Sequence, residues 1–145
     1  MTTKRELLQT EERVWHELRD RFAAVHEWEK PGVSGDWCAK DVLAHVSCWQ
    51  AQVADWLEAW RASGTKPGEV DFQGSNDDFY DRCRELALHD VQVMSGAARH
   101  RAREELGHME EPISKGWVRA IETCLQEHYE EHFPDLDAFL AKGSE

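Results

Sequence analysis

Apolar side chains recur every three or four residues along most of this chain, and no segment shows the two-residue alternation of a β-strand. This spacing places apolar side chains on one face of an α-helix. Loops containing Gly and Pro divide the chain into four such stretches. The sequence therefore predicts an all-α antiparallel four-helix bundle, with connections long enough to permit one longer crossing. A chain of 145 residues is sufficient for a single domain, 1–145, with one core.

Capping and helix-breaking residues set the expected ends of the four helices. In chain order, the helices are expected from the Thr3 cap to about His26, from about Trp37 to Ser63, from Ser75 or Asn76 to about Leu106, and from Lys115 or Trp117 to His132. Pro134 lacks the amide that a continuing helix needs, so a kink or a new helix should follow His132. Glu11 is the one polar residue that interrupts the apolar stripe of the first helix. The inward side of the third helix is predicted to consist of Phe79, Cys83, Leu86, Val93 and Ala97.

Charge and composition exclude several classes of function. The chain has 29 acidic and 17 basic residues, and its net charge of -12 would repel a phosphate backbone, so nucleic acid is not an expected partner. No stretch approaches the ~20 apolar residues of a membrane span, and no apolar run follows the N-terminus. The four cysteines lack short paired spacings and are predicted to be reduced core thiols. We therefore expect a cytoplasmic protein that does not contact a membrane.

Three histidines are the strongest candidates for functional residues in this sequence. His45 lies on the inward stripe of the second helix, and His128 and His132 share the inward face of the last helix. Three imidazoles of this kind hold a divalent ion, such as zinc or nickel, with one coordination position open for water, thiolate or substrate. In the alternative interpretation, each imidazole bonds a carbonyl, a carboxylate or water, and no metal is bound. The spacing alone leaves both interpretations open.

Other residues could join or support such a site. Cys48 and Cys124 are each within one helical turn of a candidate histidine and could supply a fourth ligand, although burial as small apolar side chains explains them too. His89, predicted on the inward side of the third helix, is a reserve ligand. Asp41 could orient the ring of His45, or it could simply be a charge at the start of its helix.

Segment 37–49 reads WCAKDVLAHVSCW, and segment 128–132 reads HYEEH. With these two segments, the chain resembles the DinB/YfiT superfamily of four-helix proteins over essentially its whole length. The resemblance implies a divalent metal held by His45, His128 and His132. It also implies an enzyme, either a thiol transferase that uses a low-molecular-weight thiol or a hydrolase that activates water, acting on a small electrophilic substrate. This metal-dependent enzyme is the function that the sequence favours.

The segments 40–45, 76–80 and 128–136 are also similar to the ClbS/DfsB group of bundle proteins. That resemblance implies a metal-free protein that binds a small molecule or protects a cell from a DNA-damaging metabolite. Trp49, Tyr80 and Tyr129 would then line the ligand pocket. A non-catalytic binding module is a further alternative, and exposed aromatic surface on long helices is compatible with a two-fold homodimer.

Overall fold

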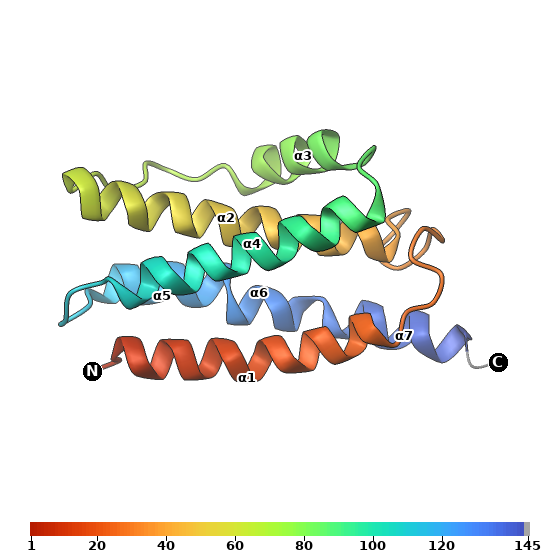
Figure 1. The fold of residues 1–145 in the computed structure, drawn as a ribbon, viewed down its shortest axis with the longest axis horizontal. Helices are drawn as coiled ribbons and strands as arrows, with labels where there is room; N and C mark the ends of the chain where they lie inside the picture. Colours follow the sequence, from red (N-terminus) through yellow and green to blue (C-terminus); the bar gives the residue numbers. More distant parts are fainter. Residues whose placement is uncertain (144–145) are drawn as a thin grey trace.

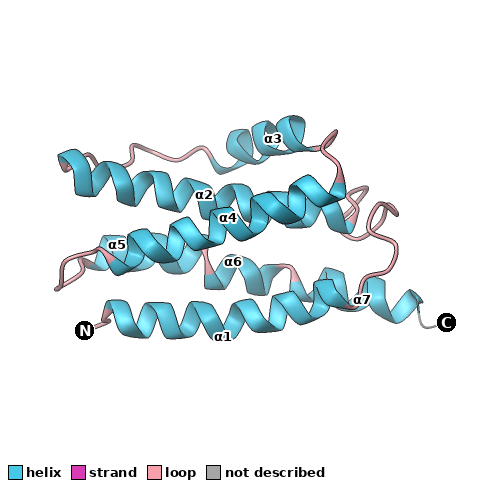
Figure 2. Cartoon of the chain, viewed as in Figure 1, coloured by secondary structure: helices cyan, strands magenta, loops and turns pink. Residues whose placement is uncertain are grey.

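The computed structural model describes residues 1–143. These residues form seven α-helices, and they contain no strand beyond an isolated bridge between Ser34 and Trp37. The helices are α1 (Lys4–Ala23), α2 (Ala39–Ser63), α3 (Phe72–Cys83), α4 (Leu88–Gly107), α5 (Lys115–Cys124), α6 (Gln126–Glu131) and α7 (Phe133–Gly143). Four rods lie side by side, formed by α1, α2, α4 and the row α5, α6 and α7, whereas α3 covers α2 (Figures 1 and 2). The prediction of an all-α helical bundle is confirmed.

The rods form two pairs that run in opposite directions. Within one pair, α2 and α4 are parallel, because Asp55 binds Arg101 at 2.9 Å and, further along both helices, Arg61 binds Glu105 at 2.8 Å. The rod α1 and the row α5, α6 and α7 run the other way (Figure 1). The bundle is thus antiparallel between pairs and parallel within each pair. Segment 64–87, which contains α3, is the longer crossing that this order requires.

The prediction of one continuous third helix is wrong, since the structure has two helices there. The first, α3, begins at the Asp71 cap rather than near Ser75. It ends where the buried Lys40 ammonium donates hydrogen bonds to the carbonyls of Arg84, at 3.3 Å, and Leu86, at 2.8 Å. These contacts from another helix satisfy carbonyls that a continuing helix would have used itself.

The break between α3 and α4 changes which residues of α4 face the core. Val93 is 58% exposed, and Ala97 and His89 are exposed as well, so their predicted inward positions are wrong. A turn without helical geometry resets the helical phase, and a stripe extrapolated through it points to the wrong face. The residues of α4 that are buried are Val91, Ser95, Ala98, Ala102 and Leu106.

This register can be tested with two matched substitutions. Val91→Ala should lower the free energy of unfolding by about 2 kcal/mol, because a fully buried side chain loses two methyl groups and leaves a void. Val93→Ala, on the solvent side of the same helix, should change it by less than about 0.5 kcal/mol. Urea denaturation followed by circular dichroism measures both, and equal losses would contradict the assigned register.

The last rod is divided twice. Ser114 caps α5, and the helix begins at Lys115 as predicted. The first division was not predicted and falls at Leu125, whose backbone angles of φ -112° and ψ -98° are not helical. The second falls at His132, and α7 then starts with Pro134 in its first turn, where proline is tolerated. A new helix just after His132 is therefore confirmed.

The structure also bears on the predictions made for membrane spans and for the cysteines. Within the described residues, no helix has the length and apolar character required to cross a bilayer. All four cysteines are buried and free, as expected for core thiols.

Candidate three-histidine site

The ring nitrogens of three histidines lie close together between α2 and the C-terminal end of α6. His45 comes from α2, His128 from α6 and His132 from the C-cap of α6. The Nε2 atoms of His45 and His128 are 2.8 Å apart, and those of His128 and His132 are 3.1 Å apart. Each histidine offers a ring nitrogen within 4.8 Å of the other two. The structure thus brings together the three histidines that the sequence singled out, while their role as ligands stays a prediction.

Burial keeps these rings uncharged near neutral pH. It lowers the pKa of His45 to about 4 and, with a small opposing effect of Asp135, the pKa of His132 to about 4. Burial, together with repulsion from the other two rings, lowers the pKa of His128 to about 2. A neutral imidazole has a free lone pair, which can bind a metal ion or accept a proton. The site is therefore suited to a ligand or base role, and it is poorly suited to donating a proton as imidazolium.

Two of the three nitrogen separations suit direct ligands of a metal ion, but the usual hydrogen bonds to the far side of the rings are missing for His45 and His128 among the described residues. Ligand nitrogens at 2.0–2.1 Å from a tetrahedral ion are about 3.3 Å apart, so the Nε2 pairs at 2.8 and 3.1 Å need only a small outward movement. The Nδ1 atoms of His45 and His128 are buried without a hydrogen-bond partner among the described residues. Ligating histidines normally donate that second N–H to a carbonyl or carboxylate. Asp41 does not serve in this way, because its carboxylate accepts hydrogen bonds from the amide and thiol of Cys38 at the start of α2.

Aromatic rings from α2, from α3 and from the residue before the cap of α2 flank the histidines. The Trp37 ring packs edge-on against His45 with centroids 5.3 Å apart, and Tyr80 stacks on Trp37 at 5.1 Å. The Trp49 ring lies 6.4 Å from that of His128. Trp37 and Tyr80 are half-buried, so this aromatic wall, formed by Trp37, Trp49 and Tyr80, reaches from the histidines to the surface. Trp49 and Tyr80 thus lie near the histidines, while the pocket-lining role that the ClbS/DfsB resemblance implies for them stays a prediction.

The other candidate ligands do not join the site. The Cys48 sulfur lies 3.6 Å from that of Cys83, and burial raises the pKa of Cys48 to about 12. Burial also raises the pKa of Cys124 to about 11, which keeps that thiol protonated. Neither cysteine belongs to the cluster of potential metal ligands found in residues 1–143, and neither does the exposed His89.

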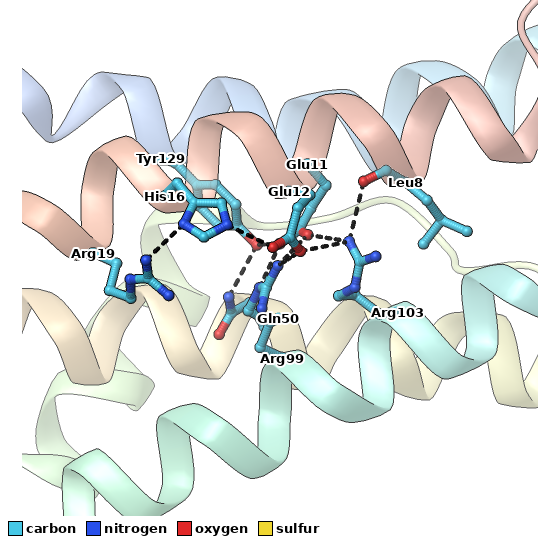
Figure 3. A network of polar contacts seen from close by, with 9 residues as sticks. All are labelled: Leu8, Glu11, Glu12, His16, Arg19, Gln50, Arg99, Arg103 and Tyr129. Atoms are coloured by element: carbon cyan, nitrogen blue, oxygen red, sulfur yellow. Dashed lines mark hydrogen bonds and ion pairs between the residues drawn. The ribbon is translucent and has the colours of Figure 1, made fainter.

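A buried polar network lies beside the site and was not predicted (Figure 3). Glu11 is 1% exposed, and both of its carboxylate oxygens accept hydrogen bonds from Arg99 at 2.9 Å. Arg103 binds the same carboxylate, and the Tyr129 hydroxyl donates to it at 2.7 Å. The sequence does point to such a network through Glu11, because a carboxylate on the apolar face of a helix needs hydrogen-bond partners when it is buried.

This network also connects the two elements that carry the histidines. Gln50 of α2 donates to the Tyr129 hydroxyl at 2.9 Å, and Tyr129 directly follows His128. The hydroxyl is held between Gln50 and Glu11, so Tyr129 does not line a pocket as the resemblance implied. Burial and the adjacent Glu11 raise the pKa of Tyr129 well above its usual value, so it stays a hydrogen-bond donor.

The lowered histidine pKa values predict acid sensitivity. Between pH 6.5 and about 4, the unfolded chain binds protons at His45, His128 and His132 that the folded chain does not. The free energy of unfolding should therefore fall with decreasing pH, by up to about 1.4 kcal/mol per pH unit for each histidine, and this contribution should be constant above pH 6.5. Urea denaturation at a series of pH values measures the slope. His128→Gln should reduce it, the exposed His89→Gln should not, and equal slopes in both variants would contradict the prediction.

The fold and the site together define a helical bundle with a cluster of neutral histidines, two buried and one half-buried. No protein-family model and no curated protein matches the sequence. Among solved structures, the chain is similar to one titled "Sibling Lethal Factor Precursor - DfsB", with a TM-score of 0.78 and 14% sequence identity, over 99% of this chain and 98% of that chain. This similarity shows the shared fold alone, so the ClbS/DfsB resemblance stays a prediction. The DinB/YfiT resemblance stays a prediction.

Proposed function

We propose that the protein binds a small electrophilic molecule at the three-histidine site, as a binding or protection protein of the ClbS/DfsB type that needs no metal. The observation that carries the proposal is the meeting of three neutral imidazoles beside the aromatic wall, in a chain whose fold matches DfsB over nearly its full length. The apolar rings would hold the body of the ligand. The Nε2 lone pairs would bind its polar group, or accept a proton from that group or from an attacking water.

Cell survival tests this proposal. Cells that express the chain should survive exposure to a DNA-alkylating metabolite better than cells that carry the empty vector. Expression of His45→Ala should give no protection, because it removes one of the three imidazoles. His16→Ala is the control, since His16 is an exposed residue of α1 outside the site. Equal survival of cells with the parent chain and the empty vector would contradict the proposal.

A second candidate function is divalent metal binding, and the separation of the Nε2 atoms favours it. His45, His128 and His132 would hold the ion. A bound ion would supply Lewis acidity and lower the pKa of a water or a low-molecular-weight thiol, as in a hydrolase or thiol transferase. The burial of the three neutral imidazoles would disfavour protons as competitors for the same nitrogens.

Metal content distinguishes the two candidates. Elemental mass spectrometry on protein purified without a histidine tag should give about one ion per chain if the second candidate is correct, and none for His45→Ala. Absence of metal in the parent chain after incubation with zinc, nickel and manganese would eliminate the second candidate. The metal-free proposal would then be the one to pursue.

A further inference from the structure

A separate cavity of about 520 Å³ lies where α2 and α4 end and the loop leads into α5. Leu57 is its first lining residue on α2, and it follows His45 by twelve residues. At 1.5 Å per residue, the two positions are about 18 Å apart along the helix. The cavity is therefore distinct from the three-histidine site. Its volume is within the range of small-molecule sites in proteins.

Two tryptophans and an apolar floor shape this cavity. The rings of Trp60 and Trp117 have centroids 5.9 Å apart and are inclined by 53°. Trp117 is buried, whereas Trp60 is 36% exposed at the rim. Leu57, Met109 and Ile113 are buried and complete the floor. Two tilted indole faces offer negative electrostatic potential to a positively charged group that lies over them on the cavity side.

The charged residues of the lining favour the same kind of ligand. Three carboxylates line the cavity, those of Glu105, Glu110 and Glu111, against the single guanidinium of Arg61. Arg61 is occupied by Glu105, with contacts of 3.0 and 2.8 Å. The Glu111 carboxylate accepts one backbone amide, and Glu110 has no ion-pair partner in the part of the chain that the structure describes. The nearby Lys4 ammonium donates to the carbonyls of Gly107 and Met109 and does not line this cavity.

An ammonium group of the chain itself already lies near one of these rings. The Lys66 Nζ atom is 5.4 Å from the centroid of the Trp60 ring, within the range of a cation–π contact. From the tryptophan pair, the excess of carboxylates and this contact, we propose that the cavity binds a small organic cation. The ligand would carry a substituted ammonium group, held by the Trp60 and Trp117 rings, and an apolar part placed on the floor. This second site is independent of the function proposed for the histidines.

Titration with choline and with its neutral analogue 3,3-dimethylbutan-1-ol tests the proposal. Both carry three methyl groups on a tetrahedral centre, and only choline is charged. Choline should shift the indole N–H signals of Trp60 and Trp117 in NMR spectra, and the shift should saturate. The dissociation constant of choline should be at least about fivefold lower than that of the alcohol. Absence of a saturable shift, or equal affinity for the two compounds, would overturn the proposal.

Matched variants locate the site. Trp60→Ala should weaken choline binding at least about fivefold, whereas Phe72→Ala, an exposed aromatic residue on α3, should leave it unchanged. Glu110→Lys changes an exposed residue that the fold does not need, so it should weaken binding without unfolding the chain. Unchanged affinity in both Trp60→Ala and Glu110→Lys would also overturn the proposal.

Discussion

Replacement of His128 by alanine should lower the rate at which the protein consumes an alkylating electrophile by at least about 100-fold, the effect typical of losing a general base. His128 is the ring whose Nε2 contacts both other histidines, so its removal disrupts the whole cluster. The measurement is loss of the electrophile by mass spectrometry, with purified protein and a chelator present so that no metal contributes.

His89→Ala is the matched control for this measurement. His89 is exposed on α4, outside the histidine cluster, and the rate should not change. Equal rates for the parent chain and His128→Ala would exclude a role of the histidines in consuming the electrophile. A rate that requires added metal and disappears with the chelator would instead favour the metal candidate.

Substitution of Glu11 by alanine should lower the free energy of unfolding by about 3 kcal/mol, the size expected when one partner of a buried charge network is removed. The Arg99 and Arg103 side chains, 19% and 29% exposed, would lose their shared carboxylate, and the Tyr129 hydroxyl would lose its acceptor. Denaturation by urea, followed by circular dichroism, measures the loss.

The neighbouring Glu12 provides the control for Glu11. Its carboxylate also contacts Arg99, at 2.6 Å, but its side chain is 43% exposed. Ion pairs with a solvent-exposed partner contribute at most about 1 kcal/mol, so Glu12→Ala should cost far less than Glu11→Ala. Similar losses for the two variants would show that burial of Glu11 does not determine the stability of this network.

The histidine cluster is predictable from the sequence because its geometry is mostly local. The helical period alone aims His45 inward and places His128 and His132 on one face of the last rod. The same reasoning places His89 wrongly, since it assumes that the helical phase continues from α3 into α4. The turn between them is stabilised by Lys40, which lies 44 residues away from Arg84 in the sequence. Only the folded chain reveals such a partner.

The same distinction applies to the polar network and to the division at Leu125. Glu11 is visible in the sequence as an unexplained charge, but its partner Arg99 is 88 residues away. No glycine or proline marks the division at Leu125, so local rules predict a continuous helix there. In both cases, contacts between distant elements decide the structure, and intrinsic propensity does not.

The buried carboxylate of Glu11 also has an evolutionary consequence. Because Arg99, Arg103 and Tyr129 all bind it, a change at one of these four positions leaves the others with unmatched charge or an unmatched hydroxyl. Descendants of this chain should therefore replace the four residues together or keep them all. Tyr129 directly follows His128, so the network also fixes the backbone position of that histidine. Substitutions that change the histidine site should therefore be limited by Glu11, a residue of a different helix.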